Sequence, residues 1–163
     1  MNSAYLILGG NLGNKRKNLA LALGMIRAGI GNILRGSNIY ETEPWGLKNV
    51  KTFFNQVIEI NTFLTPLELL EKKNKIESSF GRRRDQHNRY QSRRMDIDIL
   101  FYDKEVINMP ELTIPHPRLH ERNFVLMPLC ELAAELIHPV LNKTIRQLKA
   151  ECKDVKWTRI VPE

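Results

Sequence analysis

The distribution of apolar and polar residues divides the chain into alternating strands and helices. A period of two between apolar residues predicts a strand, a spacing of three or four predicts a helix, and glycine, proline or polar clusters mark the turns. The pattern predicts strands over residues 5–8, 33–43, 53–62 and 94–102, hairpin-like segments near 106–107 and 112–117, and helices over 15–28, from Thr65 to just before Gly81, over 124–136 and over 141–149.

The strands expected over 53–62 and 94–102 each have two different faces, and hairpin-like returns join several elements. Both features are typical of an antiparallel sheet, whereas the strands of a doubly wound parallel sheet are apolar on both faces. A length of 163 residues is sufficient for one domain with its own core. We therefore predict a single α+β sandwich domain over residues 1–163, with a mostly antiparallel sheet.

A pair of carboxylates stands at the start of the expected strand 94–102. The period of two places Asp96 and Asp98 on one face, and Met95, Ile97 and Ile99 on the other. Adjacent acids repel each other, and a cation bound between them relieves the repulsion. Oxygen ligands without sulfur or clustered imidazoles suit a hard ion, so the pair predicts a Mg²⁺ site. A strand with a solvated acidic face is the alternative, because Asp-x-Asp is a common pattern.

Arginine is concentrated directly before this acid pair. Segment 81–94 holds six arginines and one aspartate, so it carries most of the net charge of +7. Such a local excess favours an anionic ligand at one place rather than a generally basic surface. Guanidinium groups beside a metal-binding acid pair are typical of a polyphosphate site. The six arginines are Arg82, Arg83, Arg84, Arg89, Arg93 and Arg94.

Two other patterns invite a functional interpretation that the spacing does not support. The glycine-rich turn 9–14 lacks the Lys-Ser/Thr ending of a Walker phosphate loop, so we interpret it as a structural turn. His116 and His120 are spaced like a zinc pair, but Pro117 disfavours a regular helix between them and no third ligand is evident.

The remaining composition narrows the class of protein. Cys130 and Cys152 fit neither a metal spacing nor a disulfide framework, so reduced thiols are expected. The chain has no apolar run long enough to span a bilayer and no basic-then-apolar N-terminal leader. The sequence therefore predicts a soluble, cytoplasmic protein.

Taken together, the motifs resemble those of the 6-hydroxymethyl-7,8-dihydropterin pyrophosphokinases, a family of folate-pathway enzymes. The resemblance covers nearly the whole chain, and its most specific part is Arg93-x-x-Asp96-Ile97-Asp98-Ile99-Leu100. The other motifs are Gly9-x-Asn11-Leu12-Gly13, Tyr40-x-Thr42, Phe53-x-Asn55, Ile76-Glu77, Gly81-Arg82-x-Arg84, Pro115-His116-Pro117-Arg118-Leu119, Arg122-x-Phe124 and Pro128-Leu129.

The resemblance implies a ferredoxin-like α/β/α fold with three flexible catalytic loops. It also implies transfer of pyrophosphate from ATP to the hydroxymethyl oxygen of the pterin, release of AMP, and two Mg²⁺ ions. The implied partners are the small-molecule substrates ATP and 6-hydroxymethyl-7,8-dihydropterin, with no nucleic acid and no membrane, and we expect a monomer.

The resemblance also assigns roles to individual positions of this sequence. Asp96 and Asp98 match the metal ligands, and Arg82 and Arg93 match positions near the transferring group. The positions that line the ATP pocket in relatives are Asn74, Glu77, Arg84, Arg89, Arg93, Ile99, Leu112, Thr113, His116, Arg118 and Arg122. The positions of the pterin pocket are Thr42, Glu43, Trp45, Phe53, Asn55, Tyr90, Asp96 and Phe124.

The chain departs from the pattern of its relatives at four positions. Gly10 stands where relatives often have Ser, and Tyr90 where some have Trp. Asn74 replaces a Gln at the nucleotide pocket, and Gln91 replaces a small residue, often Gly, in the arginine loop.

Two alternative functions use the same residues differently. A metal-dependent nucleotidyltransferase also places an acid pair on an antiparallel sheet, but it releases inorganic pyrophosphate rather than AMP. An RNA-binding protein with a ferredoxin-like sheet requires exposed aromatic residues on its central strands for base stacking, and the sequence has no such cluster.

Overall fold

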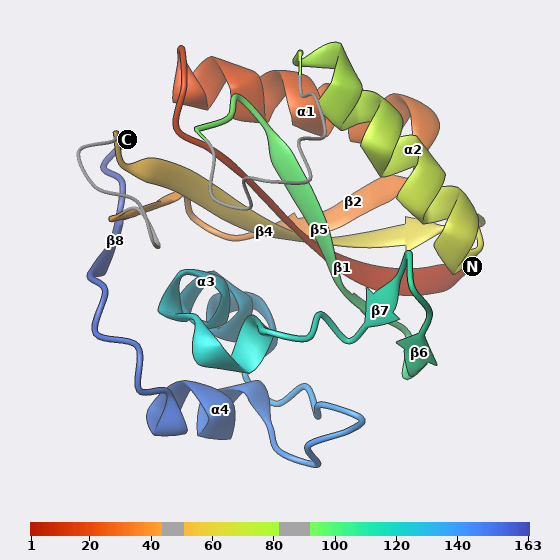
Figure 1. Ribbon diagram of the computed structural model, residues 1–163, viewed down its shortest axis with the longest axis vertical. Helices are drawn as coiled ribbons and strands as arrows, with labels where there is room; N and C mark the ends of the chain where they lie inside the picture. The colour runs from red at the N-terminus through yellow and green to blue at the C-terminus, as the bar shows by residue number, and fades with distance from the viewer. Residues whose placement is uncertain (44–50, 82–91) are drawn as a thin grey trace.

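The computed structural model describes residues 1–43, 51–81 and 92–163. It has an open sheet with helices on both faces (Figure 1). The strands are β1 (Asn2–Gly10), β2 (Asn32–Gly36), β3 (Tyr40–Thr42), β4 (Phe53–Thr62), β5 (Asp96–Tyr102), β6 (Ile107–Asn108), β7 (Thr113–Ile114) and β8 (Thr158–Ile160). The helices are α1 (Lys15–Gly29), α2 (Pro66–Ser79), α3 (Asn123–Ala133), α4 (Ile145–Glu151) and a short 3₁₀ turn (Leu119–Glu121).

The main sheet has the strand order β5-β1-β4-β3-β8, and β2 pairs with β4 beside β3. Every pairing between these strands is antiparallel. The helices α1 and α2 each connect two strands that have one strand between them, namely β1 with β2 and β4 with β5. This βαββαβ arrangement is the ferredoxin-like fold, so the predicted fold class and the antiparallel sheet are confirmed.

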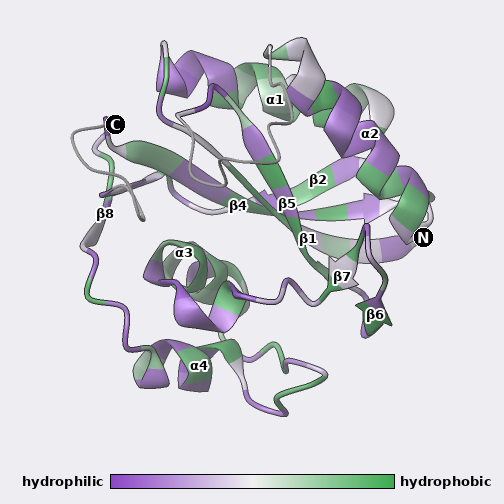
Figure 2. Ribbon diagram, viewed as in Figure 1, coloured by the Kyte–Doolittle hydropathy of each residue, from purple (hydrophilic) through white to green (hydrophobic). Residues whose placement is uncertain are grey.

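Helices α1 and α2 lie on one face of the sheet, and α3 and α4 lie on the other (Figure 1). Each face has its own apolar cluster. Leu6, Leu8, Ile58, Ile97 and Ile99 pack with α1 and α2. The opposite cluster brings residues of β1, β4 and β5 together with Val125, Leu126 and Leu129 of α3 and Ile145 and Leu148 of α4. Figure 2 shows hydrophobic residues along β1 and β5, between the two layers of helices.

Side-chain caps fix where three of the helices begin. The Asn14 side chain accepts a hydrogen bond from the Lys17 backbone N–H at 3.1 Å. Thr65 and Thr144 both form capping boxes, with Glu68 and Gln147 respectively. These contacts satisfy N–H groups that the first helical turn leaves without an intrahelical partner, and they confirm the predicted starts near Asn14 and Thr65.

The predicted elements differ from the structure in several places, and β1 (Asn2–Gly10) extends beyond the strand predicted over 5–8 at both ends. The single strand predicted over 33–43 is wrong, because Ser37 interrupts it: the Ser37 N–H donates to the Val57 carbonyl and its Oγ accepts from the Val57 N–H. The prediction 124–136 ends three residues too late, and the prediction 141–149 starts four residues too early, since the helix begins only after the Thr144 cap. Strand β8 was not predicted.

Within the described ranges, none of the helices combines the length and apolar character that crossing a membrane requires. Both cysteines are free thiols, as the sequence predicts.

Candidate active site

The candidate site lies where β1 ends, on the face of the sheet that carries α3. Gly9 of β1 pairs with Asn55 of β4 on one side and with Asp96 of β5 on the other. A Cβ atom at position 9 would stand only 2.1 Å from Asn55 Oδ1. The absence of a side chain on the central strand therefore lets the Asn55 side chain lie across β1 and approach the row that holds the acid pair.

The acid pair has the alternation that the sequence predicts. Ile97 and Ile99 are buried among the residues packed against α1 and α2, while Asp96 and Asp98 lie on the other face and remain partly exposed. Arg93 Nη1 lies 3.2 Å from Asp96 Oδ1. Two carboxylates on one strand face, with a guanidinium beside them, form a charged, oxygen-rich site.

Glu77 of α2 reaches this strand from the opposite layer. It is 3% exposed, and its Oε2 accepts a hydrogen bond from the Ile97 N–H at 2.9 Å. Lys73 Nζ lies 3.1 Å from Glu77 Oε1. Burial, with a further contribution from Asp96, raises the pKa of Glu77 to about 7 even though Lys73 acts in the opposite direction.

Asn74, one turn of α2 before Glu77, carries a buried Oδ1 that has no hydrogen-bond partner among the residues that the structure describes. A buried acceptor without a partner costs free energy, so such groups commonly mark a place where water or a ligand binds.

The segment after β7 brings His116 beside the acid pair. His116 Nε2 lies 3.9 Å from Asp98 Oδ2, and its Nδ1 accepts a hydrogen bond from the Arg118 N–H at 3.2 Å. Nδ1 therefore acts as an acceptor, and the neutral ring carries its proton on Nε2 toward Asp98. Burial lowers the pKa of His116, while the negative charge of Asp98 opposes this effect and Arg122 adds to it.

Asn55, a candidate pterin position, lies on the far side of Gly9 from Asp96. Asn55 Nδ2 donates to Thr42 Oγ1 at 3.4 Å, and Thr42 pairs with Phe53 across the ladder between β3 and β4. Thr42 and Asn55 are both buried. Phe124, the second residue of α3, packs against the cluster beneath that helix, with the Arg122 guanidinium 5.6 Å from its ring centroid.

The other predicted site positions lie in the core, on β7, after β3 or outside the described residues. Ile99 and Leu112 are buried in the core cluster beneath α1 and α2, and Thr113 belongs to β7, which lies beside β5. Glu43 follows β3, and its carboxylate accepts a hydrogen bond from the Trp157 N–H at 3.0 Å. Trp45, Arg82, Arg84, Arg89 and Tyr90 lie outside the described residues, as does the departure at Gln91.

Asn11 supports the candidate site from within, a role that the sequence interpretation did not predict. It is fully buried, its N–H donates to the Arg93 carbonyl at 2.9 Å, and its Oδ1 accepts from the Arg93 N–H at 2.8 Å. Its Nδ2 donates to the Lys51 carbonyl at 3.3 Å and to Ser92 Oγ at 3.2 Å. One side chain thus ties β1 to the residues before β4 and before β5. The signal was its place in a glycine-rich turn, which we interpreted as structural.

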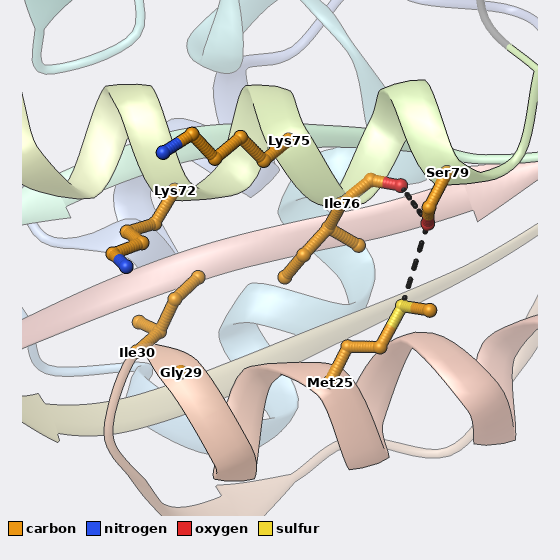
Figure 3. A pocket seen from close by; sticks show the side chains of 7 residues that line it. All are labelled: Met25, Gly29, Ile30, Lys72, Lys75, Ile76 and Ser79. Carbon is orange, nitrogen blue, oxygen red and sulfur yellow. Dashed lines mark hydrogen bonds between the residues drawn. The ribbon is translucent and has the colours of Figure 1, made fainter.

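Two further features lie apart from this arrangement. In the described part of the chain, no group of three or more His, Cys, Asp or Glu side chains is placed to hold a metal ion. A groove of about 220 Å³ lies between α1 and α2 and shares no residue with the candidate site (Figure 3). Its lining residues are Met25, Gly29, Ile30, Lys72, Lys75, Ile76 and Ser79.

Comparison with known families and proteins gives concordant results. The family model described as 7,8-dihydro-6-hydroxymethylpterin-pyrophosphokinase (HPPK) matches residues 5–134. A 2-amino-4-hydroxy-6-hydroxymethyldihydropteridine pyrophosphokinase of Bacillus subtilis is 39% identical over 136 residues, which cover 83% of this chain and 80% of that protein. The protein of the same name in Haemophilus influenzae is 36% identical over 163 residues, which cover 99% of this chain and 100% of that protein.

Solved structures show the same architecture. The HPPK-DHPS protein of Plasmodium falciparum superposes with a TM-score of 0.74 at 22% identity, over 93% of this chain. This chain spans 43% of that longer chain. At this level of identity the likeness establishes the fold of the present chain.

Proposed function

Because the chain belongs to the 7,8-dihydro-6-hydroxymethylpterin-pyrophosphokinase family, we propose that it transfers pyrophosphate from ATP to the hydroxymethyl oxygen of 6-hydroxymethyl-7,8-dihydropterin. The reaction releases AMP and is a step of folate biosynthesis. The observation that carries the proposal is the row across the end of the sheet, in which Asp96 and Asn55 flank Gly9. The half of the site around Asp96 and Asp98 is charged and rich in oxygen atoms, and the half around Asn55 is neutral. Transfer between a polyphosphate and a heterocycle requires two such halves side by side.

The acid pair suits the metal that ATP chemistry uses. Mg²⁺ prefers oxygen ligands and is commonly held by one or two carboxylates, with phosphate oxygens and water completing its shell. Asp96 and Asp98 supply such carboxylates on one face of a rigid strand, and they would hold two Mg²⁺ ions. When bound, the metal neutralises charge on the phosphate oxygens and aligns the hydroxyl group with the phosphorus that it attacks.

The residues around the acid pair bind and orient the nucleotide. Arg93 approaches Asp96 closely and would neutralise charge on the transferring group, together with Arg82. His116, Arg118 and Arg122 follow β7 in sequence, and a neutral His116 offers its Nε2 proton as a hydrogen-bond donor at the side of Asp98. The buried acceptor of Asn74 lies one turn from Glu77 and supports a nucleotide contact there, despite the replacement of Gln by Asn.

The neutral half of the site suits a flat heterocycle with donors and acceptors along its edge. Asn55 carries both a donor and an acceptor, and its bond to Thr42 holds the amide in place. Phe53 and Phe124 would supply the aromatic faces on either side of the ring, and Trp45 and Tyr90 would complete the cover. Transfer then needs only that the hydroxymethyl group extends from this half toward Asp96.

Product analysis tests the proposal directly. The protein is incubated with ATP, Mg²⁺ and 6-hydroxymethyl-7,8-dihydropterin, and the mixture is separated by chromatography. We expect equal amounts of AMP and pyrophosphorylated pterin, and no turnover when the metal is chelated. Release of inorganic pyrophosphate with a nucleotide joined to the pterin would instead identify a nucleotidyltransferase, and absence of any product would refute the proposed activity.

The family acts on small molecules, and the sheet has helices on both faces rather than an open platform for stacking bases. An action on small molecules without a nucleic-acid partner is therefore the function that we propose. A cytoplasmic location, a monomeric state and a single domain over residues 1–163 stay predictions.

A further inference from the structure

The C-terminal segment 154–162 runs along the outside of the candidate pterin half and contacts two of its elements. It lies beyond residue 134, where the match to the family model ends. Within it, β8 adds a strand to the edge of the sheet by pairing with β3, and Thr158 stands opposite Thr42 (Figure 1). The Val161 N–H donates to the Ile39 carbonyl at 2.8 Å, which continues the contact past the end of β8.

Asp154 supplies the cap that α3 does not provide for itself. The N-cap residue of this helix, Arg122, has no acceptor on its side chain and makes no side-chain capping bond. Instead Asp154 Oδ2 accepts from the Asn123 N–H at 2.9 Å, and the Asp154 carbonyl accepts from Asn123 Nδ2 at 2.8 Å. A carboxylate at this position satisfies a free N–H group and interacts favourably with the helix dipole. Phe124 is the next residue of the helix.

The same segment also binds the side chain of Glu43, the residue that follows β3. Glu43 Oε1 accepts from the Trp157 N–H at 3.0 Å, and Lys156 Nζ lies 3.9 Å from Glu43 Oε2. Asp154 Oδ1 in turn accepts from the Lys156 N–H at 2.9 Å. The Asp154 side chain therefore contacts both the start of α3 and the residues that bind Glu43. The start of α3 and the residue after β3 are thereby both bound to one short segment.

We propose that the segment 154–162 forms a strap that positions the two walls of the pterin site, with Asp154 as the central positioning residue. By capping α3, Asp154 fixes the first helical turn and hence the Phe124 ring. Through Lys156 and Trp157 the strap fixes Glu43 beside Thr42. The strap binds Asn123 and Glu43, which are the neighbours of the proposed pterin positions Phe124 and Thr42. We therefore expect it to affect binding of the pterin more than binding of the phosphates, although Arg122, a proposed ATP position, directly precedes Asn123. Its role rests on the proposed pyrophosphokinase function.

Steady-state kinetics of Asp154→Ala test the strap. Loss of an N-cap shifts the equilibrium of the first helical turn by about 3- to 30-fold, so we expect the KM for the pterin to rise about three- to tenfold. The KM for ATP and kcat at saturating pterin should stay within about twofold of the wild type. Asp154→Asn keeps one acceptor oxygen and should give an intermediate KM. Glu151→Ala is a matched control, since it removes a nearby carboxylate that forms an exposed ion pair with Lys143.

A second pair of variants tests the contact with Glu43. Trp157→Pro removes the backbone N–H that donates a hydrogen bond to Glu43, whereas Trp157→Ala removes the indole ring and keeps this N–H. We expect the proline variant alone to raise the KM for the pterin. Circular dichroism establishes that each variant is folded.

Hydrogen exchange provides a reading that does not depend on turnover. In Asp154→Ala the amides of Asn123–Leu126 should exchange faster, while those of β1 keep their protection. An unchanged pterin KM, an equal rise in the KM for ATP, or unchanged exchange at the start of α3 would overturn the strap. If the wild-type protein itself releases no AMP, the proposed function fails. The exchange rates, together with binding of the pterin in the absence of ATP, still decide whether the strap orders the start of α3.

Discussion

Glu77 carries the most sharply testable electrostatic property of this structure. Its carboxyl group is buried beneath β5, accepts the Ile97 N–H and has a pKa of about 7 instead of 4.5. A carboxyl group whose pKa is higher in the folded than in the unfolded chain binds its proton more tightly when folded. Its contribution to stability is therefore full below about pH 4.5 and is lost as the pH rises through about 7.

The substitution Glu77→Gln isolates this contribution. Gln retains an acceptor for the Ile97 N–H but cannot ionise. At about 1.4 kcal/mol per pKa unit, the change from 4.5 to about 7 corresponds to about 3 kcal/mol. The unfolding free energy of the wild type should therefore fall, relative to that of the variant, by about 3 kcal/mol between about pH 4.5 and pH 8. Urea titrations at several pH values, read by circular dichroism, measure both curves.

The difference between the two proteins is the informative quantity, because other groups also titrate in this range. The lowered pKa of His116 acts in the opposite direction, since its contribution is present above its unfolded value of 6.5 and is lost as the pH falls. Glu71→Gln is the control, because Glu71 lies on the same helix in an exposed ion pair with Lys75 that contributes little. Parallel curves for the wild type and Glu77→Gln would refute the reasoning.

Three further predictions concern the site itself. Asp98→Asn should lower kcat at least about a hundredfold at unchanged unfolding free energy, and near-normal turnover in Mg²⁺ would exclude the acid pair as the metal site. Asn55→Asp should weaken pterin binding by about 1–3 kcal/mol in calorimetry with little change for ATP, because an ionised carboxylate cannot donate; an equal loss for ATP would make Asn55 a structural residue. Asn11→Asp places a carboxylate against the Lys51 carbonyl and should lower the unfolding free energy by about 1–3 kcal/mol, whereas an unchanged urea midpoint would mean that the donated bonds contribute nothing.

Local periodicity was sufficient to predict most of the sheet. The strand 53–62 was predicted with its observed bounds, because its two faces differ along the whole length and Thr65-Pro66 marks the following helix start. The break at Ser37 could not be predicted, because it depends on a contact with Val57 twenty residues away. The same reason applies to β8, whose three residues have no apolar pattern and form a strand only because β3 presents an unpaired edge.

The geometry of the candidate site could be predicted where one strand or helix holds the residues, and could not be predicted where several elements must come together. Asp96 and Asp98 lie two apart on one strand, so their shared face follows from the strand period alone. Glu77 could be placed on a helix, but its position beneath Ile97 and the resulting pKa depend on how α2 packs on β5. The cap of α3 by Asp154 joins residues 31 apart and has no local signal at all.

The glycine-rich turn at the end of β1 shows how a sequence feature can be identified correctly and its reason missed. Its glycines are required less for a phosphate loop than for close approach. A Cβ at Gly9 would collide with Asn55, and one at Gly10 would lie 2.2 Å from the Arg94 carbonyl oxygen. Because both side chains are absent, β5 and the residues before it lie against β1, and Asn11 can exchange two hydrogen bonds with Arg93. The glycines of β1 thus leave room for the neighbouring chain segments, while β4 and β5 supply the polar side chains Asn55 and Asp96. The residues proposed to bind the two substrates therefore come from segments that lie far apart along the chain.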